Sequence, residues 1–183
     1  MRRSEVLALR WSDVDLLLCQ ISVSRSIHQL RNGSYIYRQP KSAKGRRLIA
    51  LSPSTVQVLR EHQENVLTER LMIGIPLKDT DLVFSKYDGS PIRPDTITRA
   101  WSDLAKKCGI AAHRLHDARH SHASLMLKQG VHPRIVQERL GHSTISITLD
   151  TYSHVAPGLQ EAAAQRFDDA FKVSHNETVK EKV

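Results

Sequence analysis

Hydrophobic and polar positions follow two different rhythms along the chain. Between residues 16 and 27, apolar side chains such as Ile21 and Val23 alternate with serines, and this period of two is typical of a β-strand. After Pro53, apolar residues recur three and four positions apart, which is the spacing of one face of an α-helix. The pattern therefore predicts strands in an N-terminal part and helices in the longer remainder.

The N-terminal part is expected to begin with a helix over residues 2–10, with Glu5 in its first turn. Three strands follow, at residues 16–27, 35–38 and 47–51. The turn dipeptide Asn32-Gly33 stands between the first two of them. These segments predict an α+β fold that is mainly helical, with a small three-stranded antiparallel sheet near the N-terminus.

Residues that favour helix ends divide the rest of the chain. Ser52 suits the N-cap position before Pro53. Gly109, Gly130 and Gly141 suit the left-handed position that follows a helix. Between these residues the pattern predicts helices at residues 53–74, 94–108, 115–129, 133–140, 143–155 and 157–171.

The composition is that of one globular domain. The chain has 183 residues, of which 40% are hydrophobic and 25% charged. We expect a single domain over residues 1–172 and a mobile polar tail over residues 173–183. No apolar run approaches the roughly 20 residues of a membrane span, and no signal peptide is visible. Cys19 and Cys108 lie far apart in the sequence, which favours reduced thiols and a cytoplasmic protein.

The charge balance gives the first indication of function. Lysine and arginine number 27 against 19 acidic residues, so the formal net charge is +8. An excess of this size favours a polyanionic partner, and double-stranded DNA is the usual one. A protein that is merely basic would give the same count, so charge alone leaves the question open.

The first candidate motif is His116-Asp117-Ala118-Arg119-His120. On a helix, positions three and four apart share a face, so His116, Arg119 and His120 can point the same way. Histidines at this spacing could also bind zinc. However, no glutamate follows the first histidine, and an arginine beside a zinc ion is unfavourable. A solvated or capping cluster is the other alternative.

Two further segments follow this motif. Gly141 can end a helix and Ser143 can cap the next one, so that His142 is presented where two helices meet. Tyr152 lies in a polar helical stretch, where a tyrosine is more often a packing residue than a nucleophile. Its ordinary pKa of about 10 makes it a poor nucleophile until a site activates it.

Taken together, these segments resemble the signature of the tyrosine recombinase (phage integrase) family. The order is His-x-x-Arg-His, then Leu-Gly-His, then a tyrosine ten residues later. The segment with Arg2 and Glu5 is similar to the family's Gly-x-Arg-x-x-Glu helix, and Pro-Lys-Ser at Lys41 is similar to its Pro-Lys-Thr. The resemblance runs from Met1 to about Val155 with every landmark in order.

The resemblance implies site-specific DNA recombination or integration by strand cleavage and rejoining. Tyr152 is the nucleophile by position, and its attack leaves a 3′-phosphotyrosine and a free 5′-hydroxyl. Because the covalent intermediate keeps the bond energy, the family requires no metal, ATP or other cofactor. Arg2 and Arg119 match the paired arginines that hold the non-bridging oxygens, a role that suits planar, always charged guanidinium groups.

The same resemblance assigns the remaining roles. Lys41 matches the general acid for the leaving 5′-oxygen, His116 the proton-handling residue, and His142 a hydrogen-bond donor to the phosphate. Three residues are expected to support them: Glu5, Asp117 and His120. DNA contacts are expected from the basic residues Lys44, Arg46, Arg47, Lys106, Lys107, Arg134 and Arg139. For any one of these, a solvated basic surface is the alternative.

The chain also departs from the family pattern. Ala118 stands where the family usually has leucine. Family members carry further helices and a core-binding domain before the first catalytic arginine, and we expect this chain to lack them. One alternative function is therefore a truncated remnant that binds DNA or recombinase partners without cutting. A type IB topoisomerase is a weaker alternative, because the Gly-His and Thr-Leu-Asp-Thr-Tyr segments resemble integrases more closely.

The resemblance also bears on assembly. It implies a homo-tetramer on DNA and a monomer when free. The predicted helix over residues 157–171 carries an apolar stripe that includes Phe167 and Phe171. In the family this segment often docks on a neighbouring protomer, whereas packing on its own domain is the alternative that the sequence leaves open.

Overall fold

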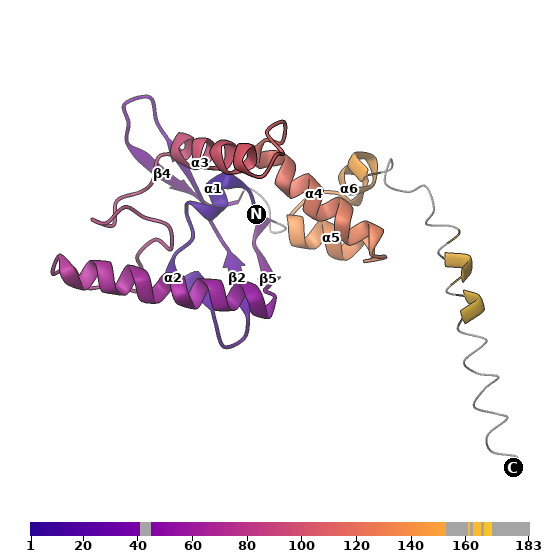
Figure 1. Ribbon diagram of the computed structural model, residues 1–183, viewed down its shortest axis with the longest axis horizontal. Helices are drawn as coiled ribbons and strands as arrows, with labels where there is room; N and C mark the ends of the chain where they lie inside the picture. The colour runs from indigo at the N-terminus through magenta and orange to yellow at the C-terminus, as the bar shows by residue number, and fades with distance from the viewer. Residues whose placement is uncertain (41–44, 153–160, 162, 166, 170–183) are drawn as a thin grey trace, which may run out of the picture.

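The computed structural model describes residues 1–40 and 45–152, together with 161, 163–165 and 167–169, and only the backbone of residues 150–152. Strands and helices are mixed, and the longest helix lies beside the strands (Figure 1). The helices are α1 (Arg3–Val6), α2 (Pro53–Met72), α3 (Pro94–Lys107), α4 (Leu115–Lys128), α5 (Pro133–Leu140) and α6 (Ile145–Tyr152). The strands are β1 (Val14–Asp15), β2 (Gln20–Val23), β3 (Ser26–Gln29), β4 (Tyr35–Arg38) and β5 (Arg47–Ala50).

The predicted α+β class and the small three-stranded antiparallel sheet are confirmed, although the strands are distributed differently. The sheet has the order β1-β2-β5, with Ile21 opposite Ile49. The segment 16–27, predicted as one strand, contains β2 and the first two residues of β3. The second of these leaves the sheet to form a separate hairpin with β4, in which Ile27 lies opposite Tyr37.

The predicted helix over residues 2–10 is wrong in its length, because α1 ends at Val6. The three residues Leu7, Ala8 and Leu9 are all buried, and an α-helix on a protein surface cannot bury three consecutive side chains against one neighbour. The chain turns instead, and Arg10 forms a β-bridge with Leu82. The turn after α1 therefore enters the core, whereas most of α1 stays nearer the surface.

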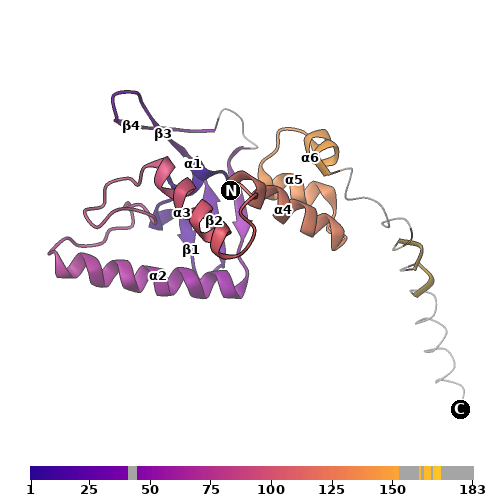
Figure 2. The same cartoon turned by 45° about the horizontal axis from the view of Figure 1, so that its top comes forward.

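The predictions for the helices after residue 52 agree more closely with the structure. Ser52 caps α2 by accepting the backbone N–H of Thr55 at 3.3 Å, and Pro53 occupies the first helical position. Figure 1 shows α2 along one side of the strands and α3 along the other. In the turned view of Figure 2, α2 still lies along one side and α3 passes in front of the strands. The main core, between α2 and the three-stranded sheet, comprises Leu9, Trp11, Ile21, Val23, Ile49, Leu59 and Val83. Ile97 of α3 packs instead against a smaller cluster of Leu7, Ala8 and Ile27.

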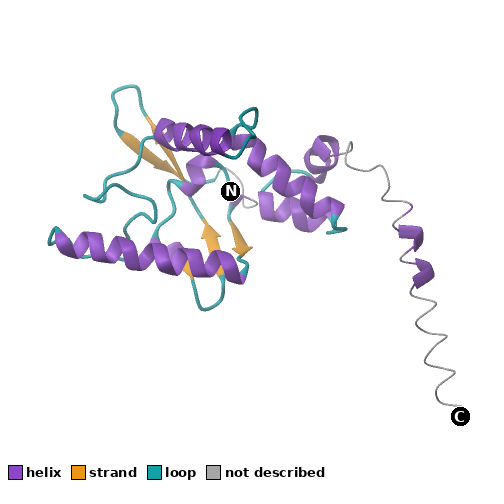
Figure 3. Cartoon of the chain, viewed as in Figure 1, coloured by secondary structure: helices purple, strands orange, loops and turns teal. Residues whose placement is uncertain are grey.

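The helices α4, α5 and α6 form a second group beside the three-stranded sheet (Figure 3). Ala123, Val136 and Leu140 make their own buried cluster between α4 and α5. Gly141 ends α5 in the left-handed conformation, with φ of +70°, as predicted. The described residues between 161 and 169 are helical, and the predicted tail at 173–183 lies outside the described part of the chain. No helix among the described residues is long and apolar enough to cross a membrane.

Candidate active site

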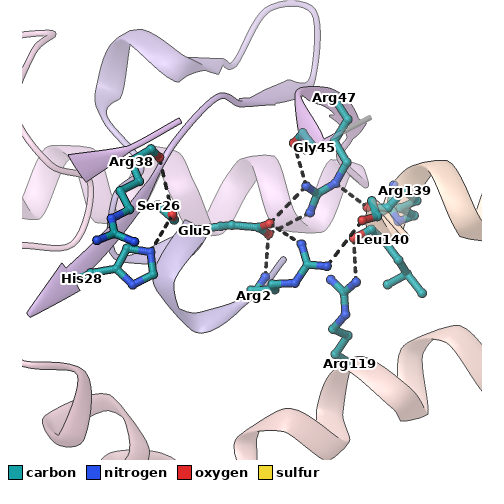
Figure 4. Close-up of polar contacts among 11 residues, drawn as sticks. Arg2, Glu5, Ser26, His28, Arg38, Gly45, Arg47, Arg119, Arg139 and Leu140 are labelled. Atoms are coloured by element: carbon teal, nitrogen blue, oxygen red, sulfur yellow. Dashed lines mark hydrogen bonds and ion pairs between the residues drawn. The ribbon is translucent and has the colours of Figure 1, made fainter. Parts of the chain in front are cut away.

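The C-terminal end of α5 is the point at which the candidate residues meet. The last carbonyls of a helix have no partner within it, and here three consecutive carbonyls each accept a hydrogen bond from an arginine of another element (Figure 4). Arg47 Nε donates to the carbonyl of residue 139 at 3.0 Å. Arg119 Nη2 donates to the next carbonyl at 2.6 Å, and Arg2 Nη2 to the one after it at 3.4 Å. The negative end of the helix dipole favours cations at this position.

Glu5 forms hydrogen bonds with two of these arginines, Arg2 and Arg47. Its carboxylate accepts the backbone N–H of Arg2 at 2.7 Å and the Arg2 Nη1 group at 2.9 Å. It also accepts two bonds from Arg47, at 2.8 and 3.3 Å. The cluster thus contains one negative charge, on Glu5, and three positive charges, on Arg2, Arg47 and Arg119. Its net charge is therefore positive.

The protonation state of Glu5 follows from these contacts. Burial by itself raises the pKa of the carboxyl group, but the Arg47 and Arg2 hydrogen bonds outweigh it and hold the pKa at about 2. Hydrogen bonds to the charged form of an acid act in this direction. Glu5 is therefore ionised at neutral pH, and its predicted role as an orienter of basic groups fits its place between them.

Arg47 lies differently from the expectation that it contacts DNA. Its side chain is 6% exposed and points into the protein, where it forms an ion pair with Glu5. Four of the hydrogen bonds that its five N–H groups can donate are made inside the protein, to Glu5, Arg139 and Gly45. Arg47 thus forms part of the internal support of the cluster.

A cavity of about 590 Å³ brings three of the predicted catalytic residues together. It lies between the N-terminal turn, α3 and α4, and Arg2, His116 and Arg119 all line it. His116 and His120 stack edge to face with their ring centroids 4.7 Å apart. Burial, followed by the charge of His116, lowers the pKa of His120. The predicted common face of this helical motif is therefore present.

Asp117, expected to orient the catalytic basic groups, instead contacts Arg114. It accepts the Arg114 backbone N–H at 2.8 Å at the start of α4 and pairs with the same guanidinium. Its position in the third residue of the helix explains this, because such an acid reaches back to the N-cap. The zinc alternative finds no support among the described residues, which contain no group of three or more ligands able to hold a metal ion.

His142 lies at the junction of α5 and α6. Its Nδ1 lies 2.9 Å from the hydroxyl of Thr148, a fully buried residue of α6. Its carbonyl accepts the side-chain N–H of Gln137 at 3.1 Å. Burial and then the positive charges of Arg119 and Arg2 lower the pKa of His142 to about 4. His142 is therefore neutral at neutral pH, and its Nε2 is the ring atom left for another partner.

Two predicted catalytic residues lie wholly or partly outside the described structure. Lys41 and its neighbours up to Lys44 are not described, although the chain resumes at Gly45, whose carbonyl accepts a bond from Arg47. Tyr152 is the last residue of α6, one helical turn after Thr148. Its side chain is not among those described. The backbone of α6 nevertheless carries this position close to the His142 junction.

The remaining residues expected to bind DNA are divided between surface and interior. Arg46, Lys106, Lys107 and Arg134 are exposed. Arg139 is half-buried, and its guanidinium donates to the carbonyl of Ala50 at 2.8 Å and to His122 at 3.1 Å. A second cavity has a volume of about 290 Å³, and the residues that line it include Arg46, Arg134 and His142.

Sequence reasoning named Glu5 and His120 as supporting residues, but it did not foresee the contacts that Thr148 and Gln137 make with His142. Thr148 belongs to the segment before Tyr152 that the sequence analysis singled out, so its place six residues after His142 could have marked it. Gln137 carries no such signal, since an isolated glutamine on a helix is usually exposed. The inward position of Arg47 depends on contacts between segments distant in the sequence.

This geometry fits a site that binds a phosphodiester with paired cations and a neutral imidazole. The family model described as the phage integrase family matches residues 1–158. The chain belongs to this family, whose members are tyrosine recombinases.

Individual relatives agree with this assignment. The ICEBs1 integrase of Bacillus subtilis is 33% identical over 172 residues, which are 92% of this chain and 45% of that protein. A XerC-like tyrosine recombinase of Caldanaerobacter subterraneus is 29% identical and is matched over 46% of its length. The chain thus spans about half the length of these curated relatives.

Solved structures show the same fold. The Tn1549 transposon integrase, in complex with transposon right-end DNA, superimposes with a TM-score of 0.74 at 24% identity, over 91% of this chain and 54% of that one. The XerA recombinase gives a TM-score of 0.65 at 26% identity, over 90% of this chain and 53% of that one.

Proposed function

We propose that this chain is the catalytic part of a site-specific tyrosine recombinase, which cleaves and rejoins double-stranded DNA through Tyr152. The observation that carries the proposal is the convergence of Arg2 and Arg119 on consecutive carbonyls at the end of α5, directly before His142. In a chain of this family, that arrangement is suited to holding one phosphate between two guanidinium groups and an imidazole.

The proposed first step is an in-line displacement at phosphorus. The Tyr152 oxygen forms a bond to phosphorus, and the bond from phosphorus to the 5′-oxygen of the next nucleotide breaks. The proton of the tyrosine is released to a base, and the leaving oxygen takes up a proton to become a 5′-hydroxyl. Attack of a 5′-hydroxyl on the phosphotyrosine reverses these changes and rejoins the strand.

The cations act mainly on the transition state. Negative charge grows on the non-bridging oxygens as phosphorus becomes five-coordinate, so Arg2 and Arg119, already fixed in place, stabilise that state more than the ground state. His142 donates from Nε2 to a phosphate oxygen when the Thr148 hydroxyl donates to Nδ1. This tautomer requires a neutral ring, in agreement with the low pKa of His142.

The proton transfers fall to residues around this clamp. We assign the base to His116, which lines the same cavity as both arginines, and the acid to Lys41 by its family position. His120 supports His116 through their ring contact. The exposed basic residues Arg46, Arg134, Lys106 and Lys107 are proposed to contact DNA phosphates, and their contribution is expected to weaken steeply with salt.

The proposal is tested by trapping the covalent intermediate. The full chain is incubated with a pool of nicked duplexes in EDTA, digested, and examined by mass spectrometry for a nucleotide on Tyr152. An adduct is expected in EDTA because the reaction needs no metal, and Tyr152→Phe should abolish it while salt-sensitive DNA binding persists. DNA binding without any adduct would instead favour the binding-only alternative. An adduct that persists in Tyr152→Phe would show that another residue is the nucleophile.

Assembly on DNA is part of the same proposal. We propose a monomer in solution and a tetramer on DNA, with the segment at 157–171 docking on a neighbouring protomer. The described residue Phe167 is 64% exposed. Sedimentation of the DNA complex with and without residues 157–183 tests this point. An unchanged mass would argue that the segment packs within its own chain.

A further inference from the structure

We infer that Arg47 is a positioning residue of the active site: its buried guanidinium fixes the Arg2–Glu5 turn against the end of α5 and so sets Arg2 and His142 in one geometry. The inference rests on the proposed function, because it explains how the proposed phosphate clamp is held. It assigns Arg47 no contact with DNA, in contrast to the expectation from sequence.

The first observation is the direction of each bond from Arg47. Two nitrogens form a fork on the Glu5 carboxylate, at 2.8 and 3.3 Å. The same carboxylate holds both the backbone and the guanidinium of Arg2. Arg47 therefore acts on Arg2 through Glu5, and a fork of two parallel hydrogen bonds restricts the rotation of that carboxylate.

The second observation is the contact with α5. Arg47 Nε donates to the carbonyl of Arg139, three residues before His142. The guanidinium also lies against Gly141, where an added Cβ would come within 2.8 Å of Arg47 Nη1. Gly141 is thus needed for two reasons, its left-handed conformation and the space that Arg47 occupies.

The third observation concerns Gly45, where the described chain resumes four residues after Lys41. Arg47 Nη1 donates to the carbonyl of Gly45 at 3.3 Å. One guanidinium group therefore contacts Gly45 and the segments that bear Arg2 and His142. Its side chain is 6% exposed. These hydrogen bonds therefore lie away from water, where the lower dielectric makes each of them stronger than at the surface.

The experiment separates DNA binding from chemistry in Arg47→Met and Arg47→Lys. Adduct formation on Tyr152 is measured in single turnover at saturating protein, and the Kd for the same duplex is measured in the Tyr152→Phe background. Arg47→Met should slow adduct formation by about 100-fold, the scale of a catalytic group misplaced by about 1 Å, with the Kd unchanged. Arg47→Lys keeps the charge but cannot form the fork, so it should recover only a small part of the rate.

A matched control removes a second buried arginine. Arg70, in α2, is 3% exposed, and the C-terminal end of α2 lies on the opposite side of the molecule from α5 (Figure 1). Arg70→Met should leave the adduct rate and the Kd as they are. An equal loss of rate in both methionine variants would overturn the inference, because it would trace the effect to general destabilisation. A weaker Kd with normal chemistry at saturation would also overturn it and would make Arg47 a DNA contact.

A readout that needs no activity distinguishes this inference from the proposed function. In ¹H–¹³C spectra of the folded protein at pH 7, the imidazole signals of His142 should shift in Arg47→Met and Arg47→Lys and stay in place in Arg70→Met. If the unmodified chain forms no adduct but His142 shifts, the proposed function fails and the positioning role stands. If adducts form normally in both Arg47 variants and His142 does not shift, the positioning role fails alone.

Discussion

In the described part of the chain, the buried side chains of Arg47 and Arg70 lie in very different surroundings. Arg47 makes a fork on Glu5 and donates to two backbone carbonyls. Arg70 lies in α2 with its Nη2 atom buried and without a hydrogen bond to the described part of the chain, and Asp81 approaches it only to 4.0 Å. Both guanidinium groups pack on a left-handed glycine, Gly141 for Arg47 and Gly89 for Arg70.

The two arginines differ in how well their buried positive charge is compensated. A buried charge is costly unless an opposite charge and hydrogen bonds compensate it. Around Arg70 the compensation is weak, so this guanidinium acts mainly as a packing group. Around Arg47 every bond leads to a segment that carries a candidate catalytic residue. The well-compensated arginine is the one that brings distant segments together.

The largest difference in stability between the two sites is expected when the acidic partner of each arginine is removed. Glu5→Ala leaves the buried Arg47 charge uncompensated and should lower the free energy of unfolding by about 3–5 kcal/mol. Asp81→Ala should cost only about 1–2 kcal/mol, because its pair with Arg70 is long and partly exposed. Urea unfolding of both variants measures the difference. Equal losses would show that the two arginines are compensated alike.

The pH dependence of stability provides a second test at the Arg47 site. Because the folded-state pKa of Glu5 is about 2, below its ordinary 4.5, the ion pair stabilises the fold fully above pH 4.5. That contribution, about 3 kcal/mol, is lost as the pH falls from 4.5 toward 2. Unfolding of the unmodified chain and of Glu5→Gln should therefore differ most near pH 6 and converge near pH 2. A constant difference across this range would contradict the lowered pKa.

The two glycines allow a finer comparison. An added Cβ would lie 2.8 Å from Arg47 at Gly141 and 2.5 Å from Arg70 at Gly89. Both alanine variants carry the left-handed strain of about 1–2 kcal/mol. Gly141→Ala should cost about 1 kcal/mol more than Gly89→Ala, because moving Arg47 breaks hydrogen bonds. In the Arg47→Met background this excess should vanish, which thermal unfolding of the double variant measures.

The sequence predicted those parts of the fold that depend on local pattern. The cap at Ser52, the helix 133–140 and its end at Gly141 are confirmed, because each depends on residues a few positions apart. The N-terminal helix was predicted too long, since the burial of Leu7, Ala8 and Leu9 is decided by distant strands and helices. Similarly, nothing local divides residues 16–27 into two sheets.

The same limit applies to the site. The order of the motifs identified the candidate residues, and the structure brings Arg2, Arg119 and His142 to the end of α5. The inward direction of Arg47 and the contact of Asp117 with Arg114 were not foreseen. A basic residue in a basic chain looks the same in sequence whether it faces a phosphate or a buried carboxylate. Only the fold determines which of these it meets.

The smallest expected effect is on the titration of His142. Its folded-state pKa, about 4, lies below the ordinary 6.5, first because of burial and then because of nearby arginines. Between pH 6.5 and 4 the unfolded chain binds the extra proton, so His142 makes the fold less stable as the pH falls through this window, above the window of Glu5. Arg47→Met removes one of the charges and should raise this pKa, whereas Arg70→Met should not. Histidine NMR titration of the two variants compares them directly, and identical midpoints would show that the charge of Arg47 does not reach the His142 ring.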